Sequence, residues 1–344
     1  MKAIQIPQAR QIRLTELPVP TAGPGEILLQ LRYVGFCGSD LNTWRGRNAM
    51  AKPEVIPGHE IGAVIAATGP DVPDQFKAGQ VVTVNPYTHC GHCASCRAGR
   101  FNACENNETL GVQRDGAMRE YIALPWQKII PAEGIALRDA ALIEPMSVGF
   151  HAVARGQVTD ADTVMVIGCG MVGLGAVIRA VRRGATVIAA DLDPEKLRLA
   201  RDLGAAYTYN TATPWQDLPA PSVVIEAVGA APTYRLAIER ADFCGRVVCI
   251  GYAKGDVELP TSLIVKKELD VRGSRNATPS DFESVIRAVR QAYDQTVIPG
   301  LTGNLLDRFV SGIVRPAEAQ EALERWDADP GKVFRILTQW NTEN

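Results

Sequence analysis

The chain has 344 residues, of which 46% are hydrophobic and 22% charged, and its 36 basic and 38 acidic residues give a net charge of −2. Because no long run of one charge sign is present, the chain lacks the basic face that nucleic acid or an anionic membrane requires. No apolar stretch approaches the roughly 18 residues of a membrane span, and the N-terminus has no signal-peptide core. We therefore expect a cytoplasmic protein of two domains with no nucleic-acid or membrane partner.

The first part of the chain, residues 1–147, is predicted to be rich in β-strands. Short apolar or alternating runs such as EILLQLRYVGF and VIAATG are interrupted at brief intervals by Gly and Pro. This pattern is typical of strands joined by turns.

Three motifs in this part carry side chains that bind metals or protons. They are GFCGSD, PGHEIG and ALIEP, and they contribute Cys37, Ser39, Asp40, His59, Glu60 and Glu144. A lone cysteine is usually a buried filler residue, and a lone His-Glu pair more often lies on the surface. A thiolate, an imidazole and carboxylates together nevertheless suit a catalytic zinc with one exchangeable position.

Four of the eight cysteines of the chain, Cys90, Cys93, Cys96 and Cys104, form a C-x2-C-x2-C-x7-C string. Thiolates at such short spacings converge on one tetrahedral zinc, which needs four soft ligands when its role is structural. We expect a structural zinc lobe over about residues 86–108. The alternative, a zinc-ribbon binding module, usually comes with a basic face, which this slightly acidic chain lacks.

From about residue 162 the pattern changes to alternating strands and helices. Apolar runs such as TVMVIGCG, TVIAAD, SVVIEAVG and RVVCIG are separated by segments of helical periodicity, for example MVGLGAVIRAVRRGA. Strands alternating with helices of this length predict an α/β domain with a doubly wound parallel sheet, which we assign to residues 148–275.

A G-x-G-x-x-G motif, formed by Gly168, Gly170 and Gly173, follows the first of these strands. Its glycines permit a tight turn, close approach to a pyrophosphate and close helix packing. Asp191 ends the next strand and is placed to accept hydrogen bonds from ribose hydroxyls, which favours NAD over NADP. The candidate cofactor-binding residues are Gly168, Gly170, Met171, Val172, Gly173, Asp191, Val228, Gly229 and Gly251.

The last part of the chain, residues 276–344, contains two stretches of helical pattern, near 280–293 and 316–326. A closing strand, KVFRILTQ, follows them. We interpret this part as returning to the first domain, which makes that domain discontinuous.

The cysteine string, the GHE motif and the VIGCGMVGLGA loop occur in the order and at the spacing of one family, so the chain resembles the zinc-dependent medium-chain dehydrogenases. Within that family, CGSD, GHE and EPMSVGFHAV resemble the polyol and sugar-acid branch of sorbitol, L-idonate, L-galactonate and threonine dehydrogenases. The resemblance implies a Rossmann coenzyme domain and a GroES-like catalytic domain. It also implies NAD, two zinc ions per chain, and a homodimer or homotetramer.

The resemblance further implies roles for individual residues. Cys37 and His59 would ligate the catalytic zinc. Glu60 would be either a direct third ligand or a residue just behind the metal. Glu144 would either ligate the zinc or hold its bound water.

Other roles follow from the same resemblance. Asp40 would orient His59, and Ser39 would accept the proton of the substrate alcohol. Many relatives carry a histidine where this chain has Asn42, so a proton relay here would run through Ser39 and water, or through Glu144. Arg275 would contact substrate, and Arg119 or Arg275 would pair with a substrate carboxylate.

The reaction implied is the oxidation of a secondary alcohol by NAD, on a metal that lowers the pKa of the bound alcohol. The substrate is expected to be a small polyhydroxylated molecule. We rank a sugar acid first, a neutral polyol or sugar second, and threonine or a 2,3-diol third.

Overall fold

The structure is a computed structural model that describes residues 1–52, 54–215, 217–294 and 303–341. The chain divides into two compact units. One comprises Met1–Glu144 with Phe309–Asn344, and the other is Pro145–Arg308. The first unit is therefore discontinuous, as the sequence pattern indicates.

The first unit is built mainly from short strands. Its strands are β1 (Lys2–Gln5), β2 (Arg13–Glu16), β3 (Glu26–Phe36), β4 (Glu60–Thr68), β5 (Val81–Val84), β6 (Tyr121–Pro125), β7 (Ile129–Pro131), β14 (Gly312–Val314) and β15 (Ile336–Gln339). Its helices are α1 (Gly38–Trp44), α2 (Ala94–Arg97), α3 (Leu137–Ala140) and α11 (Ala319–Ala328), with short 3-10 turns η1 (Phe101–Ala103), η2 (Trp126–Lys128), η3 (Pro316–Glu318) and η4 (Pro330–Lys332).

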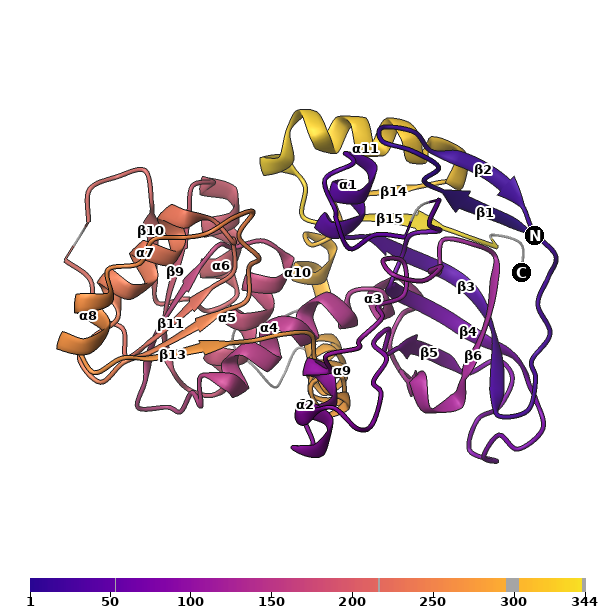
Figure 1. Cartoon of the computed structure of the whole chain (residues 1–344), viewed down its shortest axis with the longest axis horizontal. Helices are drawn as coiled ribbons and strands as arrows, with labels where there is room; N and C mark the ends of the chain where they lie inside the picture. The colour runs from indigo at the N-terminus through magenta and orange to yellow at the C-terminus, as the bar shows by residue number, and fades with distance from the viewer. Residues whose placement is uncertain (53, 216, 295–302, 342–344) are drawn as a thin grey trace. The chain divides into compact units, whose positions relative to one another are not determined.

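Strand β3 is the central strand of this unit. Its side chains alternate between a buried and a more accessible face. Ile27, Leu29 and Leu31 are fully buried, which is the period-two pattern of a strand with one face in a core. Strand β3 pairs antiparallel with β4, β6 and β15. Figure 1 shows the yellow C-terminal strand β15 beside the indigo strand β3, so the two ends of the chain share one sheet.

The second unit has alternating strands and helices. Its strands are β8 (Thr163–Ile167), β9 (Thr186–Asp191), β10 (Tyr207–Asn210), β11 (Val223–Glu226), β12 (Arg246–Cys249) and β13 (Asp270–Gly273). Its helices are α5 (Met171–Arg182), α6 (Pro194–Asp202), α7 (Ala231–Arg240), α8 (Thr261–Lys266), α9 (Pro279–Tyr293) and α10 (Gly303–Asp307), and most of α4 (Ile143–Arg155) also belongs to it.

The sheet of the second unit runs β10-β9-β8-β11-β12-β13 in the described residues, with every pair parallel. The order reverses at β8, where the chain steps first toward β9 and later toward β11. This is the doubly wound arrangement, which binds a dinucleotide outside the carboxyl ends of the strands at the switch point. The predicted α/β class is thus confirmed.

The sequence pattern did not predict strand β10, helix α8 and helix α10 of this unit. Strand β10 has the sequence YTYN with a single buried residue, Tyr209, so it has little apolar periodicity of its own. Its pairing with β9 holds it in the sheet. Helix α8 has no buried residue and is short.

The second unit extends further along the chain than the boundary at residue 275 predicts. Helix α9 belongs to it because the helix packs against α4 and α5. His151 Nδ1 on α4 lies 2.9 Å from Asp281 Oδ2, and Arg182 of α5 donates a hydrogen bond to Gln291. The return to the first unit begins at Phe309 instead of residue 276. Residues 295–302 and 342–344 of the predicted return lie outside the described residues.

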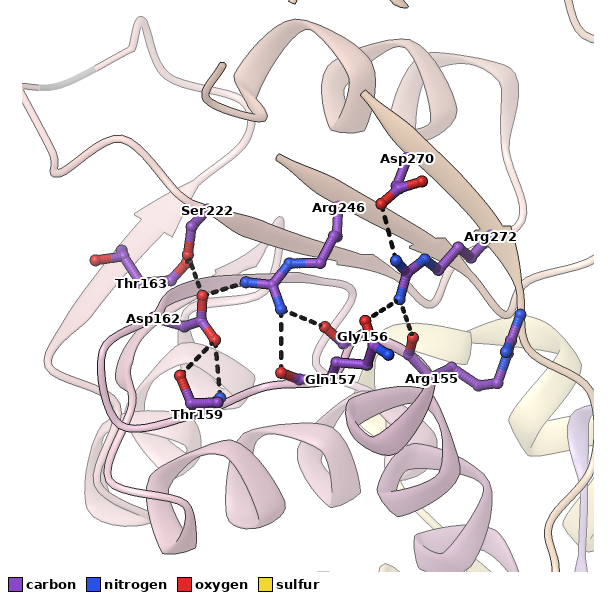
Figure 2. A network of polar contacts seen from close by, with 10 residues as sticks. All are labelled: Arg155, Gly156, Gln157, Thr159, Asp162, Thr163, Ser222, Arg246, Asp270 and Arg272. Atoms are coloured by element: carbon purple, nitrogen blue, oxygen red, sulfur yellow. Dashed lines mark hydrogen bonds and ion pairs between the residues drawn. The ribbon is translucent and has the colours of Figure 1, made fainter. Parts of the chain in front are cut away.

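A polar network around the buried Asp162 joins the amino ends of the parallel strands (Figure 2). Asp162, just before β8, forms an ion pair with Arg246 at the start of β12. Its carboxylate also accepts hydrogen bonds from Ser222 Oγ at 2.7 Å and from the Thr159 amide at 2.8 Å. Burial raises the pKa of Asp162, but these donors and the charge of Arg246 outweigh it and hold the pKa below its usual value.

We predict that Asp162→Asn destabilises the second unit by about 3 kcal/mol at neutral pH, because Arg246 loses its buried counter-charge. A carboxyl with a depressed pKa stabilises the folded state above its unfolded pKa of about 3.9 and loses that effect as the pH falls further. The difference between variant and parent should therefore shrink below about pH 4. Urea unfolding of the variant and the parent at several pH values measures this difference in the free energy of unfolding.

The matched control is Asp270→Asn, which removes the exposed partner of Arg272 in the same network (Figure 2). An exposed pair contributes about 0–1 kcal/mol. If both substitutions lowered the free energy of unfolding equally, the Asp162–Arg246 pair would stabilise the protein no more than the exposed pair does.

Candidate catalytic zinc and nucleotide sites

The four clustered cysteines converge as their spacing predicts. All four Sγ atoms lie within 4.8 Å of one another, and Cys93 Sγ is 3.9 Å from Cys104 Sγ. Sulfurs bonded to one tetrahedral zinc at 2.3 Å would stand about 3.8 Å apart. Backbone amides of the lobe point at the sulfurs, for example that of Cys93 at Cys90 Sγ, and amide donors stabilise thiolates. The lobe therefore fits a closed structural zinc site.

A second cluster forms because of how β3 and β4 pair. Gly35 at the end of β3 lies opposite Glu60 at the start of β4. Cys37, two residues after Gly35, and His59, one residue before Glu60, are thus brought to the same point. The Cys37 sulfur, a ring nitrogen of His59 and a carboxylate oxygen of Glu60 lie within 4.8 Å of one another. We call these three residues the ligand triad.

Glycine at position 35 leaves room for the Glu60 carboxylate. A Cβ atom at this position would lie 2.2 Å from Glu60 Oε2, well inside any real contact. The backbone of β3 therefore forms the wall of the triad, and only glycine allows the buried glutamate to fit there.

The triad contains buried polar atoms that no protein group satisfies. His59 Nδ1 and both oxygens of Glu60 accept or donate no hydrogen bond within the described residues. Arg335 Nε is 3.0 Å from Glu60 Oε2, which is an ion-pair distance without hydrogen-bond geometry. Buried polar atoms of this kind are costly, so their presence indicates an unseen ligand. A divalent cation satisfies a thiolate, an imidazole and a carboxylate together.

The charge around the triad also requires a cation. Cys37, Glu60, Asp40 and Glu144 supply four potential negative charges, and all four act on the buried guanidinium of Arg335. Arg335 and a protonated His59 can balance at most two of these charges, so a divalent ion would lower the remaining negative charge. Arg335 lies just before β15 and donates to the Phe36 carbonyl at 2.6 Å. No motif pointed to Arg335, although a charged residue inside the apolar run KVFRILTQ was a signal.

Burial and neighbouring charges shift the pKa values of the triad residues. Burial raises the pKa of Cys37, but the hydrogen bond and positive charge of His59 outweigh it and lower the pKa to about 7. Burial lowers the pKa of His59, yet Cys37, Asp40 and Glu144 raise it well above its usual value. Burial raises the pKa of Glu60 well above its usual range, and Arg335 offsets this only in part.

Asp40 does not hydrogen-bond to His59, contrary to the role expected for it. Its Oδ2 accepts the Cys37 amide at 2.7 Å, which caps helix α1, and its Oδ1 has no hydrogen-bond partner within the described residues. Asp40 acts on His59 through charge, and its main contact fixes the backbone of Cys37. Ser39 lies in the first turn of α1, with its Oγ buried and without a hydrogen-bond partner in the described part of the chain.

Glu144 lies beside the triad but is not part of it. It sits in the first turn of α4, is 4% exposed, and its charge reaches His59 and Glu60. Its Oε1 accepts a hydrogen bond from the hydroxyl of Tyr87, which lies on the loop after β5. No local pattern pointed to Tyr87, since 57 residues separate it from its partner.

The glycine-rich loop of the second unit has the expected backbone. Gly168 has φ +94° and a Cβ there would meet Val228, while a Cβ at Gly173 would lie 1.7 Å from the Gly168 carbonyl oxygen. Gly170 is the N-cap residue of α5, and a Cβ there would have no described atom within 4 Å, so the space beside it is open. Met171 and Val172 are the first two residues of α5. The backbone amides at the N-terminus of this helix therefore lie beside the glycine-rich loop.

A cavity of about 280 Å³ lies at the carboxyl ends of β8, β9 and β11. Asp191 ends β9 on its wall, and its carboxylate accepts the amides of Cys169 at 2.7 Å and Asp193 at 2.9 Å. The lining residues are Ile167, Gly168, Gly170, Ala190, Asp191, Leu192, Lys196, Thr211, Ala227, Val228 and Thr233. The position and lining fit the adenosine end of a dinucleotide.

The remaining cofactor candidates lie near this cavity. Gly229 has φ +77° and packs against the backbone of Gly251 and Tyr252. Val228 is half exposed on the cavity wall. The amides of Val228 and Gly229 donate to Glu226 Oε1, which holds this loop in place.

The two predicted substrate arginines belong to different units. Arg119 lies in the first unit, where burial lowers its pKa and the charge of Asp115 acts against this. Its Nε is buried and has no hydrogen-bond partner within the described residues. Arg275 follows β13 in the second unit.

Comparison with known proteins agrees with this geometry. Residues 23–134 match the family model of the alcohol dehydrogenase GroES-like domain, and residues 171–291 match that of the zinc-binding dehydrogenases. The chain is 34% identical to L-galactonate-5-dehydrogenase of Escherichia coli K12, over 85% of this chain and 88% of the relative. It is also 34% identical to sorbitol dehydrogenase of Bacillus subtilis 168, over 79% of this chain and 81% of the relative.

A solved structure of the alcohol dehydrogenase RspB of Escherichia coli CFT073, complexed with NADH, superposes with a TM-score of 0.87 at 28% identity. The match covers 99% of each chain. The chain belongs to the zinc-dependent medium-chain dehydrogenase family and falls in its polyol branch. It is therefore an oxidoreductase that depends on zinc and a nicotinamide dinucleotide.

We predict about two zinc ions per purified chain, measured by elemental analysis. Cys37→Ser should lose one of them, because the triad loses its thiolate, while retaining NAD binding in the second unit. Cys96→Ser should lose the other zinc and destabilise the lobe. A parent protein with a single zinc that Cys37→Ser retains would contradict a metal at the triad.

We also predict that the triad binds zinc more tightly as the pH rises. The ligand form of His59 is neutral and that of Cys37 is deprotonated, so zinc must displace the proton that the raised pKa of His59 retains. Affinity should therefore be lower near pH 6 than near pH 8. Competition with a chromophoric chelator measures it, with Cys37→Ser as the control for the structural site; a flat profile would contradict the assigned protonation states.

Proposed function

We propose that this enzyme oxidises a secondary alcohol of a sugar acid or polyol to the ketone, reversibly and with NAD as the hydride acceptor. The ligand triad of Cys37, His59 and Glu60, with its unsatisfied buried polar atoms on His59 and Glu60, is the observation that carries the proposal. Zinc held there would lower the pKa of a substrate hydroxyl and polarise the ketone product. NAD would accept the hydride from the alcohol carbon.

The residues of the first unit then have distinct tasks. Cys37, His59 and Glu60 would hold the zinc, and catalytic zinc sites with three protein ligands bind water or substrate as well. Ser39 Oγ, buried and without a hydrogen-bond partner in the described residues, is suited to take the hydroxyl proton of the substrate. Asn42 cannot accept a proton, so the proton leaves by water or Glu144. Asp40 fixes the start of α1 and thereby Cys37.

NAD is favoured over NADP by the carboxylate of Asp191. Both of its oxygens accept backbone amides, so the charge is fixed at the cavity wall where the adenosine ribose would lie. A 2′-phosphate would meet this negative charge. Lys196 lines the same cavity, and its positive charge would offset part of that repulsion. Assays with both cofactors therefore belong to the test.

A sugar acid is the first candidate substrate, because the relative named L-galactonate-5-dehydrogenase is 34% identical over most of the chain. A carboxylate would pair with Arg275 or with Arg119, which is half-buried and whose fork of donors is suited to bidentate binding. Sorbitol dehydrogenase at the same identity supports a neutral polyol as the alternative. L-threonine 3-dehydrogenase at 30% identity keeps threonine as a third candidate.

We further propose that the chain forms a homodimer or homotetramer. Strand β13 ends the sheet of the second unit, and its side chains are largely exposed, including Val271. An open edge of this kind is suited to pairing with another copy.

No helix in the described residues has the length and apolar character needed to cross a bilayer.

The experiment that tests the substrate class compares a sugar acid with its reduced neutral counterpart, using NAD and NADP at the nicotinamide absorbance. We expect NAD-dependent turnover of the sugar acid. Removing the carboxylate-binding arginine should lower kcat/KM for the acid by about 100-fold, or about 2.7 kcal/mol, since a hydrogen-bonded charge pair has roughly that value.

Arg275→Ala and Arg119→Ala are tested separately, and each is the matched control for the other. The variant that affects the acid should leave turnover of the neutral polyol unchanged. Faster parent turnover of the neutral polyol, with both arginine variants unaffected, would favour the polyol alternative. Full activity in Cys37→Ser would overturn the zinc mechanism.

A further inference from the structure

The chain that leads into His59 is hydrogen-bonded to a distant segment, residues 115–118, which we call the backing segment. The carbonyls of the three residues before His59 each accept one of its amides. The pairs are Gly116 with Ile56 at 2.6 Å, Met118 with Pro57 at 3.0 Å and Ala117 with Gly58 at 2.9 Å. Asp115 Oδ1 also accepts the Ile56 amide at 3.1 Å. The backing segment therefore holds the backbone at each of these three residues.

Glycine allows the two segments to approach each other this closely. A Cβ atom at Gly116 would lie 2.3 Å from the carbonyl oxygen of Gly58 and 2.6 Å from that of Pro57. A Cβ atom at Gly111, just before the backing segment, would lie 2.5 Å from the Gly58 nitrogen. These obstructing atoms all belong to the backbone, so they cannot rotate away as a side chain can. Gly116 does not have a positive φ, so the lack of space is what requires glycine there.

The position of the His59 ring depends on this backbone. A ring nitrogen of His59 lies within 4.8 Å of the ligand atoms of Cys37 and Glu60. His59 Nδ1 is buried and has no hydrogen-bond partner within the described residues, so this nitrogen does not anchor the ring. Metal–ligand distances are fixed to within about 0.2 Å. A small displacement of Gly58, which precedes His59 directly, would therefore change the geometry at the metal.

We propose that Asp115 and Gly116 of the backing segment are positioning residues for the metal site, because they hold the chain before His59 where its ring shares one ion with Cys37 and Glu60. The inference rests on the proposed function, since it requires a metal at the triad. An alanine at position 116 forces the two backbones apart, and His59 moves with the displaced chain. Groups that support a metal ligand in this way typically change metal affinity by about 10- to 100-fold.

The test measures the zinc affinity of the triad in the whole protein by competition with a chromophoric chelator. Cys37→Ser, which retains only the structural site, is subtracted. Gly116→Ala should lower the triad affinity at least about tenfold, while the zinc of the cysteine lobe and the affinity for NADH stay as in the parent. The matched control is Gly312→Ala on β14 of the same unit, where a Cβ atom has no described atom within 4 Å. This control should keep the parent affinity.

Substitutions of Asp115 test the same role without inserting an atom between the backbones. Asp115→Ala removes the acceptor of the Ile56 amide and should lower the zinc affinity of the triad. Asp115→Asn keeps an oxygen acceptor at this place and should restore most of that affinity. Lys52→Met removes only the exposed ion pair of Asp115, in which Nζ and Oδ2 are 3.5 Å apart, and should change nothing at the metal.

The outcomes separate this inference from the proposed function. If the parent binds no zinc beyond that of Cys37→Ser, the metal assignment fails, and the proposed function fails with it. If the parent binds this zinc and Gly116→Ala binds it equally tightly, the role of the backing segment is overturned. If Gly116→Ala does not fold, Asp115→Ala decides. An unchanged zinc affinity in that variant overturns the inference, and a loss that Asp115→Asn restores supports it.

Discussion

The structure depends on the antiparallel register of β3 and β4. Because Gly35 lies opposite Glu60, the residues just beyond each strand end, Cys37 and His59, meet at one buried point. Gly35 has no side chain to fill the space that the Glu60 carboxylate needs. A slip of one residue would turn the buried face of β3 outward and separate the triad. The metal site is thus a consequence of sheet pairing and not of an independent loop.

Charge balance explains the surroundings of that point. A thiolate and buried carboxylates near one another are unstable unless cations compensate them. Arg335 enters from the C-terminal strand, which pairs with β3, and supplies one positive charge. A divalent ion held by the triad would supply two more. The discontinuous course of the chain therefore has an electrostatic function, because the last part of the sequence completes a site begun by the first.

The second unit separates stability from binding at opposite ends of its parallel strands. The carboxyl ends hold the glycine loop, Asp191 and the cavity, where backbone atoms must remain accessible to a ligand. The amino ends hold the Asp162–Arg246 network, whose donors are satisfied within the protein. Helix amides that are left available for phosphates contribute no hydrogen bond to the folded protein. The Asp162–Arg246 network at the other end connects the same strands and stabilises them.

The sequence alone determined the elements whose chemistry is local. The cysteine spacing, the glycine loop with Asp191, and the strand and helix periods depend on neighbouring residues, so they were predictable. Only the tertiary structure decided which distant groups meet. Arg335 and Tyr87 reach the site through pairing and packing over long separations. The Asp40 carboxylate accepts the Cys37 amide at the start of α1 instead of a hydrogen bond from His59. Helix α9 joins the second unit through contacts with α4 and α5. Periodicity reports which face of an element is buried, but the partner that buries it is set by the whole fold.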